Sequence, residues 1–217
     1  MNPVSGRSRP RDPVSSLTHL AGSAASVIVT VALVAASSRG LWWPFLVFGL
    51  SLTALYSASG VYHAVRLPAR ALEWFRKLDH SSIFILIAGT YTPVLMLGLR
   101  GPWRSGSLIA IWGVAAAGVT LKLVSVRQAR WVTTLLYVVM GYLSVAVIGQ
   151  LANALPGAAI LSLVVGGVLY TLGALVYATK RFNPYPGVFG FHEVWHLFVL
   201  AGSAAHVVMM FQILPLA

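Results

Sequence analysis

Seven apolar segments divide almost the whole chain, and each approaches the length needed to cross a lipid bilayer. They cover residues 19–37, 41–64, 80–99, 106–124, 130–150, 158–179 and 192–213. A membrane-spanning helix needs about 20 apolar residues. The segments lack the alternating pattern of barrel strands, and a closed barrel is the only other spanning architecture. The sequence therefore predicts an all-α integral membrane protein, a bundle of seven transmembrane helices.

Composition supports a single membrane domain. Only 9% of the 217 residues are charged and 58% are hydrophobic, whereas a soluble domain carries about 25% charged residues. Residues 1–15 are rich in Arg, Pro and Ser, which predicts a disordered basic tail. Residues 16–217 contain no repeat or linker and form one predicted domain. The chain has no cysteine, which excludes disulfides and thiolate metal sites.

The basic residues between the apolar segments predict the orientation in the membrane. Twelve Lys and Arg residues fall on the side of the N-terminus and three on the other side. By the positive-inside rule, the N-terminus is cytoplasmic, the C-terminus is outside, and the protein is a multi-pass cell-membrane protein. The same rule accounts for the net charge of +11, so no nucleic-acid partner is needed. The first apolar segment exceeds the 7–15 residues of a signal-peptide core, which favours an uncleaved helix.

Two predicted helices bring three histidines to the cytoplasmic end of the bundle. His63 ends the second helix, and His192 and His196 lie four residues apart on one face of the seventh. Three imidazoles and a water form an open zinc site, which is typical of a catalytic metal. Histidines can instead be packing residues, but the shared membrane depth favours a joint Zn²⁺ site.

Two further residues are candidates for catalysis beside this metal site. Asp79 opens the third helix and is a candidate to orient the water or accept its proton. The alternatives are an ion pair with Lys77 or a helix cap. Ser59 lies one turn from His63, within reach of the water or a substrate carbonyl, although small residues also serve helix packing.

The remaining histidines fit the site less well. His206 follows His196 by ten residues, about 15 Å along a helix, which indicates the core or a second polar site. His80 lies about 100° around the helix from Asp79 and is expected to face elsewhere. His19 enters the first helix from the cytoplasmic side and is a weaker candidate to line the site.

The sequence His192-Glu193-Val194-Trp195-His196 also matches the H-E-x-x-H pattern of metalloproteases, in which the Glu is the general base. No Asp, Glu or Cys follows Glu193 to provide a third ligand, and His206 is poorly placed for that role. A protease is therefore the less favoured interpretation.

Three motifs together resemble the signatures of the hemolysin III family, which shares a superfamily with progestin and adipoQ receptors and alkaline ceramidases. They are Ser59-Gly60-Val61-Tyr62-His63, Lys77-Leu78-Asp79-His80, and Gly190 to Phe198 with its two histidines. The resemblance implies seven helices, a cytoplasmic N-terminus, and zinc held by His63, His192 and His196. It also implies that Asp79 and Ser59 lie beside the metal.

Three functions remain open at this point. The favoured one is a zinc-dependent hydrolase of a lipid amide or ester, with membrane lipids as partners and substrate. A non-enzymatic sensor or receptor-like protein with structural zinc is the second. A cytolytic or pore-forming protein is the third, although the helices show no extended polar stripe. Substrate and oligomeric state do not follow from the sequence.

Overall fold

The structure is a computed structural model that describes residues 10–38, 40–124 and 129–217. Seven helical segments in this part of the chain are long and apolar enough to cross a membrane, which confirms the predicted fold class. The helices are α1 (Pro13–Ala36), α2 (Trp42–Ala64), α3 (Ala69–Gly98), α4 (Gly101–Val124), α5 (Arg130–Tyr142), α6 (Ile148–Ala154), α7 (Gly157–Thr179) and α8 (Phe191–Ile213). Short 3₁₀ helices, η1 (Leu143–Val147) and η2 (Leu214–Leu216), follow α5 and α8.

The start of the chain differs from the predicted boundary. Residues 1–9 lie outside the described residues, but Pro13–Ser15, which were assigned to the tail, form the first turn of α1. Proline suits the first position of a helix because its missing N–H would have no partner there. The backbone N–H of Asp12 donates to the carbonyl of His63, so this segment is tied to the end of α2.

Helix α3 begins eleven residues before the expected start at residue 80. Its first turns, Ala69 to Leu78, carry most of the charge of the helix, and hydropathy alone therefore excluded them from the predicted span. The 30 residues of α3 reach about 45 Å, more than the roughly 30 Å of a hydrocarbon core. The charged turns therefore extend α3 beyond the apolar layer.

The fifth span is interrupted in its middle by the 3₁₀ helix η1. A change of helix type leaves backbone groups without their usual partners, which is costly inside a membrane. The hydroxyl of Tyr91, on α3, donates to the carbonyl of Gly141 at 2.6 Å and accepts the N–H of Ser144 at 2.7 Å. One tyrosine side chain thus satisfies both sides of the interruption.

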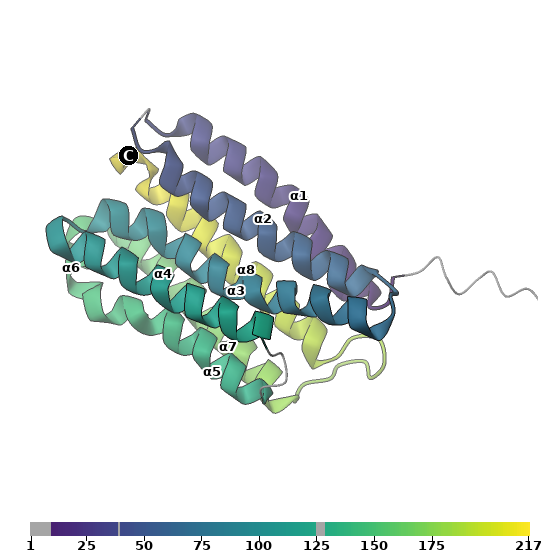
Figure 1. Ribbon diagram of the computed structural model, residues 1–217. Coiled ribbons are helices and arrows are strands. Elements are labelled where there is room, and N and C mark those ends of the chain that lie inside the picture. Colours follow the sequence, from purple (N-terminus) through teal and green to yellow (C-terminus); the bar gives the residue numbers. More distant parts are fainter. Residues whose placement is uncertain (1–9, 39, 125–128) are drawn as a thin grey trace, which may run out of the picture.

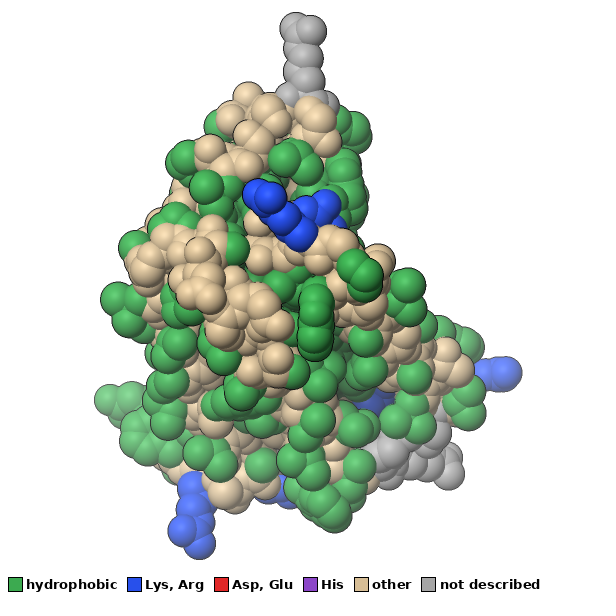
Figure 2. All heavy atoms as spheres, turned by 90° about the vertical axis from the view of Figure 1, so that its left-hand side faces the viewer, with side chains coloured by type: hydrophobic (Ala, Val, Ile, Leu, Met, Phe, Trp, Pro, Cys, Tyr) green, Lys and Arg blue, Asp and Glu red, His purple; other side chains and the backbone are tan. Residues whose placement is uncertain are grey.

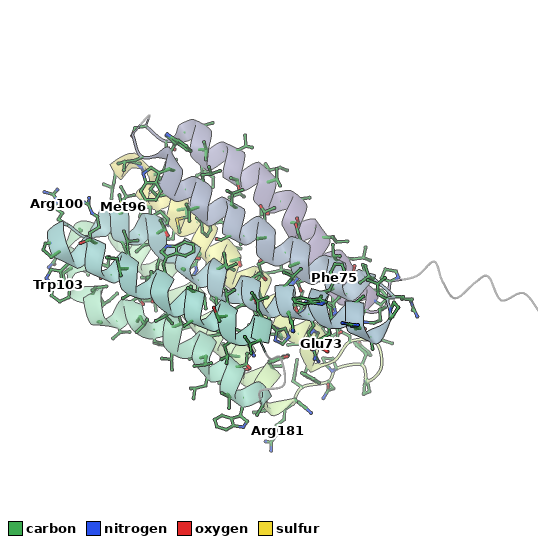
Figure 3. All side chains as sticks on the ribbon, viewed as in Figure 1. Glu73, Phe75, Met96, Arg100, Trp103 and Arg181 are labelled. Carbon is green, nitrogen blue, oxygen red and sulfur yellow. The ribbon has the colours of Figure 1, made fainter. Side chains whose placement is uncertain are left out.

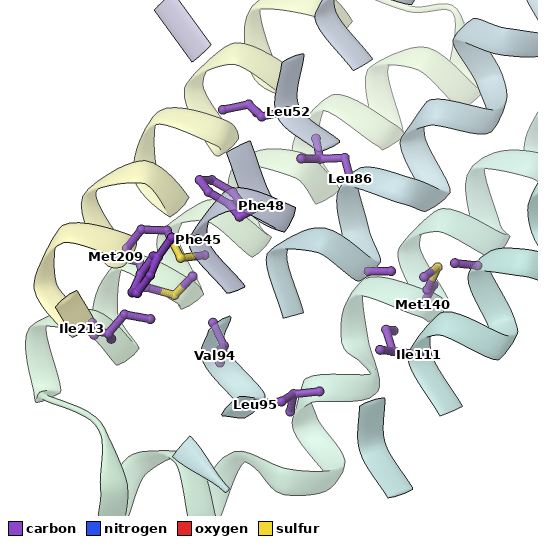
Figure 4. Close-up of a cluster of buried hydrophobic side chains, with 14 of the residues drawn as sticks. Phe45, Phe48, Leu52, Leu86, Val94, Leu95, Ile111, Met140, Met209 and Ile213 are labelled. Carbon is purple, nitrogen blue, oxygen red and sulfur yellow. The ribbon is translucent and has the colours of Figure 1, made fainter. Parts of the chain in front are cut away.

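Helix α3 lies in the interior of the bundle: 72% of its most apolar stretch is buried, against 22% for α1 and α4. Helix α8 packs against α7, α1 and α3 (Figure 1). Large side chains such as Phe45 and Phe48 of α2 and Met209 of α8 are fully buried, and Figure 4 shows them in one cluster. This packing fixes how α2, α3 and α8 approach one another.

The two termini of the described chain lie at opposite ends of the bundle, as an odd number of spans requires (Figure 1). Figure 3 shows Glu73 and Phe75 near the N-terminal end and Arg100 and Trp103 at the other. That other end faces the viewer in Figure 2 as a mainly hydrophobic surface with a few basic side chains. The His63 end of α2, the start of α3 and the start of α8 share the N-terminal end.

A close helix contact supplies a first test of the packing. A Cβ atom at Gly118 of α4 would lie 2.5 Å from the buried ring of Phe84, whereas one at Gly113 of the same helix meets nothing. We expect Gly118→Ala to cost about 1–3 kcal/mol of stability through overpacking. Thermal unfolding of detergent-purified protein should show a lower midpoint for Gly118→Ala than for Gly113→Ala. Equal midpoints would contradict this α3–α4 contact.

The orientation in the membrane remains a prediction from the loop charges. Because the chain lacks cysteine, single-cysteine variants can report it with a membrane-impermeant maleimide. Ser105→Cys is exposed at the start of α4, and Val188→Cys is exposed in the α7–α8 connection. We expect intact cells to label Ser105→Cys, and Val188→Cys to be labelled only after permeabilisation. The reverse pattern would place the histidine end outside the cell.

Candidate metal centre

A cavity of about 550 Å³ opens at the N-terminal end of the bundle, where α1, α3 and α8 begin and α2 ends. The side chains that line it include all five residues selected from the sequence as a site: Ser59, His63, Asp79, His192 and His196. Because these residues come from α2, α3 and α8, the cavity depends on the packing of three helices far apart in the sequence. The predicted convergence at one end of the bundle is therefore observed.

The three histidines approach one another closely enough to share one ion. One ring nitrogen from each of His63, His192 and His196 lies within 4.8 Å of the other two. The Nε2 atoms of His63 and His192 are 3.2 Å apart. Zinc–imidazole bonds of about 2.0–2.1 Å in tetrahedral geometry need nitrogens about this distance apart. The donor set and its spacing therefore fit a metal ion.

The carboxylate of Asp12 fixes the ring of His63. Oδ2 of Asp12 lies 2.8 Å from Nδ1 of His63, so a proton on Nδ1 is donated to the carboxylate and Nε2 keeps its lone pair. Metal-binding histidines are commonly oriented by a carboxylate in this way. Arg11 holds the same oxygen through two hydrogen bonds, of 3.1 and 3.0 Å.

Electrostatics favour the charged form of this carboxylate. Partial burial alone would raise the pKa of Asp12, but the hydrogen bonds from His63 and Arg11 outweigh it, and the pKa lies below its usual value. Asp12 is therefore an anion that can accept the His63 proton. Sequence reasoning missed this role because Asp12 was assigned to the tail. The Asp12-Pro13 pair at a helix start was the available signal.

His19 and His80 both line the cavity. The ring of His19 stacks on that of His196, with centroids 3.8 Å apart, and both rings are buried. His19 therefore supports one candidate ligand, His196, from the side, in line with the weaker prediction that it lines the site. His80, which was expected to face elsewhere, is a lining residue as well, because the cavity wraps around more of the α3 surface than the position of Asp79 alone implies.

His206 lies outside this cavity. It is buried deeper in α8, with its ring 5.4 Å from that of Tyr170, and it lines a second cavity of about 280 Å³. This agrees with the prediction that His206 cannot join the three ligands.

Glu193 serves the start of α8 rather than a protease-like reaction. One carboxylate oxygen accepts the backbone N–H of Gly190 at 2.8 Å, and the other accepts the hydroxyl of Ser15 at 3.2 Å. These bonds cap α8 and join it to α1. A carboxylate with both oxygens engaged in this way is poorly available as a general base.

Fold and site together define a class: a multi-pass, seven-helix membrane protein with a three-histidine group able to hold a metal ion. Comparison with known proteins identifies the family. The family described as Haemolysin-III related matches residues 7–207. Hemolysin-3 from Bacillus cereus is 36% identical over 210 residues, which cover 94% of this chain and 92% of that protein. The Hemolysin-3 homolog of Bacillus subtilis (strain 168) is 34% identical over 195 residues, 88% of each chain. The chain therefore belongs to the haemolysin III family.

The link between Asp12 and His63 can be tested by metal binding. We expect Asp12→Asn to weaken zinc affinity about 10- to 100-fold, because the amide no longer accepts the Nδ1 proton as an anion does. Glu73→Gln makes the same chemical change on α3 outside the cavity and should leave affinity unchanged. Competition with a zinc-selective chelator measures both variants. Wild-type affinity in Asp12→Asn would contradict the orienting role.

Proposed function

We propose that this protein is a zinc-dependent hydrolase that cleaves an amide or ester bond of a membrane lipid. The observation that carries the proposal is a three-histidine group in a cavity that also holds a carboxylate and a hydroxyl, Asp79 and Ser59. Zinc suits a site made of imidazoles. Three protein ligands leave a position for water and substrate, as in catalytic zinc sites.

The chain's own side chains divide the remaining tasks. A bound zinc ion would lower the pKa of water to about 7 and polarise a carbonyl. The carboxylate of Asp79, which lines the same cavity as the three histidines, accepts the proton of the attacking water and returns it to the leaving group. The hydroxyl of Ser59, which is 2% exposed, donates to the substrate carbonyl oxygen. Asp12 keeps the proton on Nδ1 of His63 throughout.

A lipid substrate is supported by the second cavity. Its walls are mostly apolar residues of α3, α5, α7 and α8, and it shares Leu55, Ile83, Tyr137, Trp195 and Val199 with the histidine cavity. Because the two cavities share these walls, a carbonyl beside the histidines can continue into an acyl chain in the apolar part. The hydrophobic effect contributes about 0.8 kcal/mol for each buried CH₂ group.

The names of the Bacillus relatives point to a different function, lysis of cells. A cytolytic protein should release the contents of liposomes whether or not the histidines are present. A sensor with structural zinc should keep its cellular effect when Asp79 is replaced by Ala. Liposome leakage by the histidine variants and the cellular effect of Asp79→Ala therefore distinguish these two functions from hydrolysis.

We expect detergent-purified protein to contain one zinc ion per chain, measured by elemental analysis. His63→Ala and His196→Ala should each lose it, because two imidazoles bind zinc far more weakly than three. His206→Ala makes the same change in the same bundle, outside the ligand group, and should retain the metal.

The zinc-loaded protein should hydrolyse at least one member of a panel of lipid amides and esters. Asp79→Asn should keep its zinc while its rate falls by about 10²–10⁴-fold, the usual contribution of a general base. A zinc-loaded wild type that is inert toward the whole panel, or an Asp79→Asn variant at the wild-type rate, would overturn the proposal.

A further inference from the structure

Two basic side chains lie in the wall of the histidine cavity, on α3 and α4. Lys122 of α4 belongs to a membrane-spanning helix, yet only 1% of it is exposed. Its ammonium group donates to the hydroxyl of Thr133 at 2.6 Å. Arg76 of α3 lines the same cavity. A charged side chain buried in a membrane-spanning helix, as Lys122 is, is costly and usually marks a functional site.

The Nε atom of Arg76 is buried and has no hydrogen-bond partner within the described residues. Glu73 and Asp79 each lie three residues from Arg76 along α3, but the described residues contain no ion pair within 4.0 Å between Arg76 and either carboxylate. Arg76 and Lys122, which carry charges of the same sign, both line this cavity. Two like charges therefore face one part of the cavity.

The other carboxylates of the cavity are already engaged. Asp12 bonds to Arg11 and His63, and Glu193 bonds to Gly190 and Ser15. The positive-inside rule explains basic residues in the loops, but it predicts solvated side chains, not a buried Lys122 and a half-buried Arg76 that line one cavity. This part of the wall therefore has the charge of an anion site.

We propose that Arg76 and Lys122, with the hydroxyls of Thr133 and Thr134, bind the phosphate of an anionic lipid whose acyl carbonyl reaches the three histidines. A guanidinium group bonds a phosphate through two N–H donors, and an ammonium group acts as a point charge. Both threonines are at most 6% exposed and line the cavity beside Lys122. As a statement about the substrate, the inference rests on the proposed hydrolase function.

The order of the residues along α3 matches the order of groups in such a lipid. Helix α3 runs from the N-terminal end of the bundle toward its middle, and Arg76 precedes Asp79 by three residues, about 4.5 Å of helix. A phosphate at Arg76 would thus lie nearer the membrane surface than a carbonyl beside Asp79. Thr134 also lines the apolar second cavity, so the phosphate site continues into a space for acyl chains. This continuity favours a lipid phosphate over free phosphate.

Binding to the full-length, detergent-purified protein tests the proposal without turnover. The probes are dioctanoyl phosphatidic acid, dioctanoylglycerol with the same chains, and inorganic phosphate, each titrated by native mass spectrometry. We expect the lipid phosphate to bind at least tenfold more tightly than the neutral lipid, which corresponds to about one charge-assisted hydrogen bond. Equal binding of the two lipids would overturn the anion site. Equal binding of inorganic and lipid phosphate would overturn the lipid assignment.

Arg76→Gln should abolish the preference for the lipid phosphate, and Lys122→Met, which removes the charge and keeps an unbranched side chain, should do the same. Arg70→Gln, an exposed residue of α3 outside the cavity, is the matched control and should keep the preference. Zinc content reports folding of each variant, and Arg76→Gln alone suffices if Lys122→Met does not fold. A preference that survives in Arg76→Gln would overturn the proposal.

Hydrolysis of both lipids is measured in parallel, so the two proposals can fail separately. A preference for the phosphate without any hydrolysis, of these lipids or of the panel above, would remove the enzyme and leave the anion site. Hydrolysis of the neutral lipid alone, without a binding preference, would leave the enzyme and remove the anion site.

Discussion

The hydrogen bond between Asp12 and His63 joins the first two helices at the candidate metal centre. Two backbone bonds accompany it, from Asp12 to His63 and from Arg11 to Ala64, so the start of α1 is attached along the last turn of α2. This attachment holds the ring of His63 with Nε2 toward α8. It also places His19, about two helical turns further along α1, against His196. The geometry of the three ligands therefore depends on a contact outside the apolar spans.

Glu193 provides the corresponding attachment on the other side. It caps α8 and accepts the hydroxyl of Ser15, so α1 contacts both ligand-bearing helices through short polar bonds. Hydrogen bonds depend on direction and distance, whereas apolar side chains can pack against a neighbouring helix in several ways. The apolar core positions the helices roughly, and these polar bonds define the distances between the histidines.

The sequence was sufficient for the seven spans and the three histidines because each rests on a strong local signal. Apolar length defines a span, and a four-residue spacing defines one helix face. Three features could not be read in this way. The early start of α3 is charged, the η1 interruption contains no proline and depends on Tyr91 from another helix, and Asp12 acts on a residue 51 positions away. Each depends on tertiary contacts that hydropathy does not report.

The placement of the histidines and acidic residues indicates that the bundle is organised around this cavity. The chain has six histidines and four acidic residues, and five of the histidines and three of the acidic residues line this one cavity. Polar and ionisable groups oppose membrane insertion wherever they occur in a span. A chain selected only for a stable bundle would replace them with apolar residues, as in the cluster around Phe45 and Met209. Their concentration at one end, beside an apolar cavity, is what the proposed hydrolysis of a lipid requires, because a lipid has one polar and one apolar part.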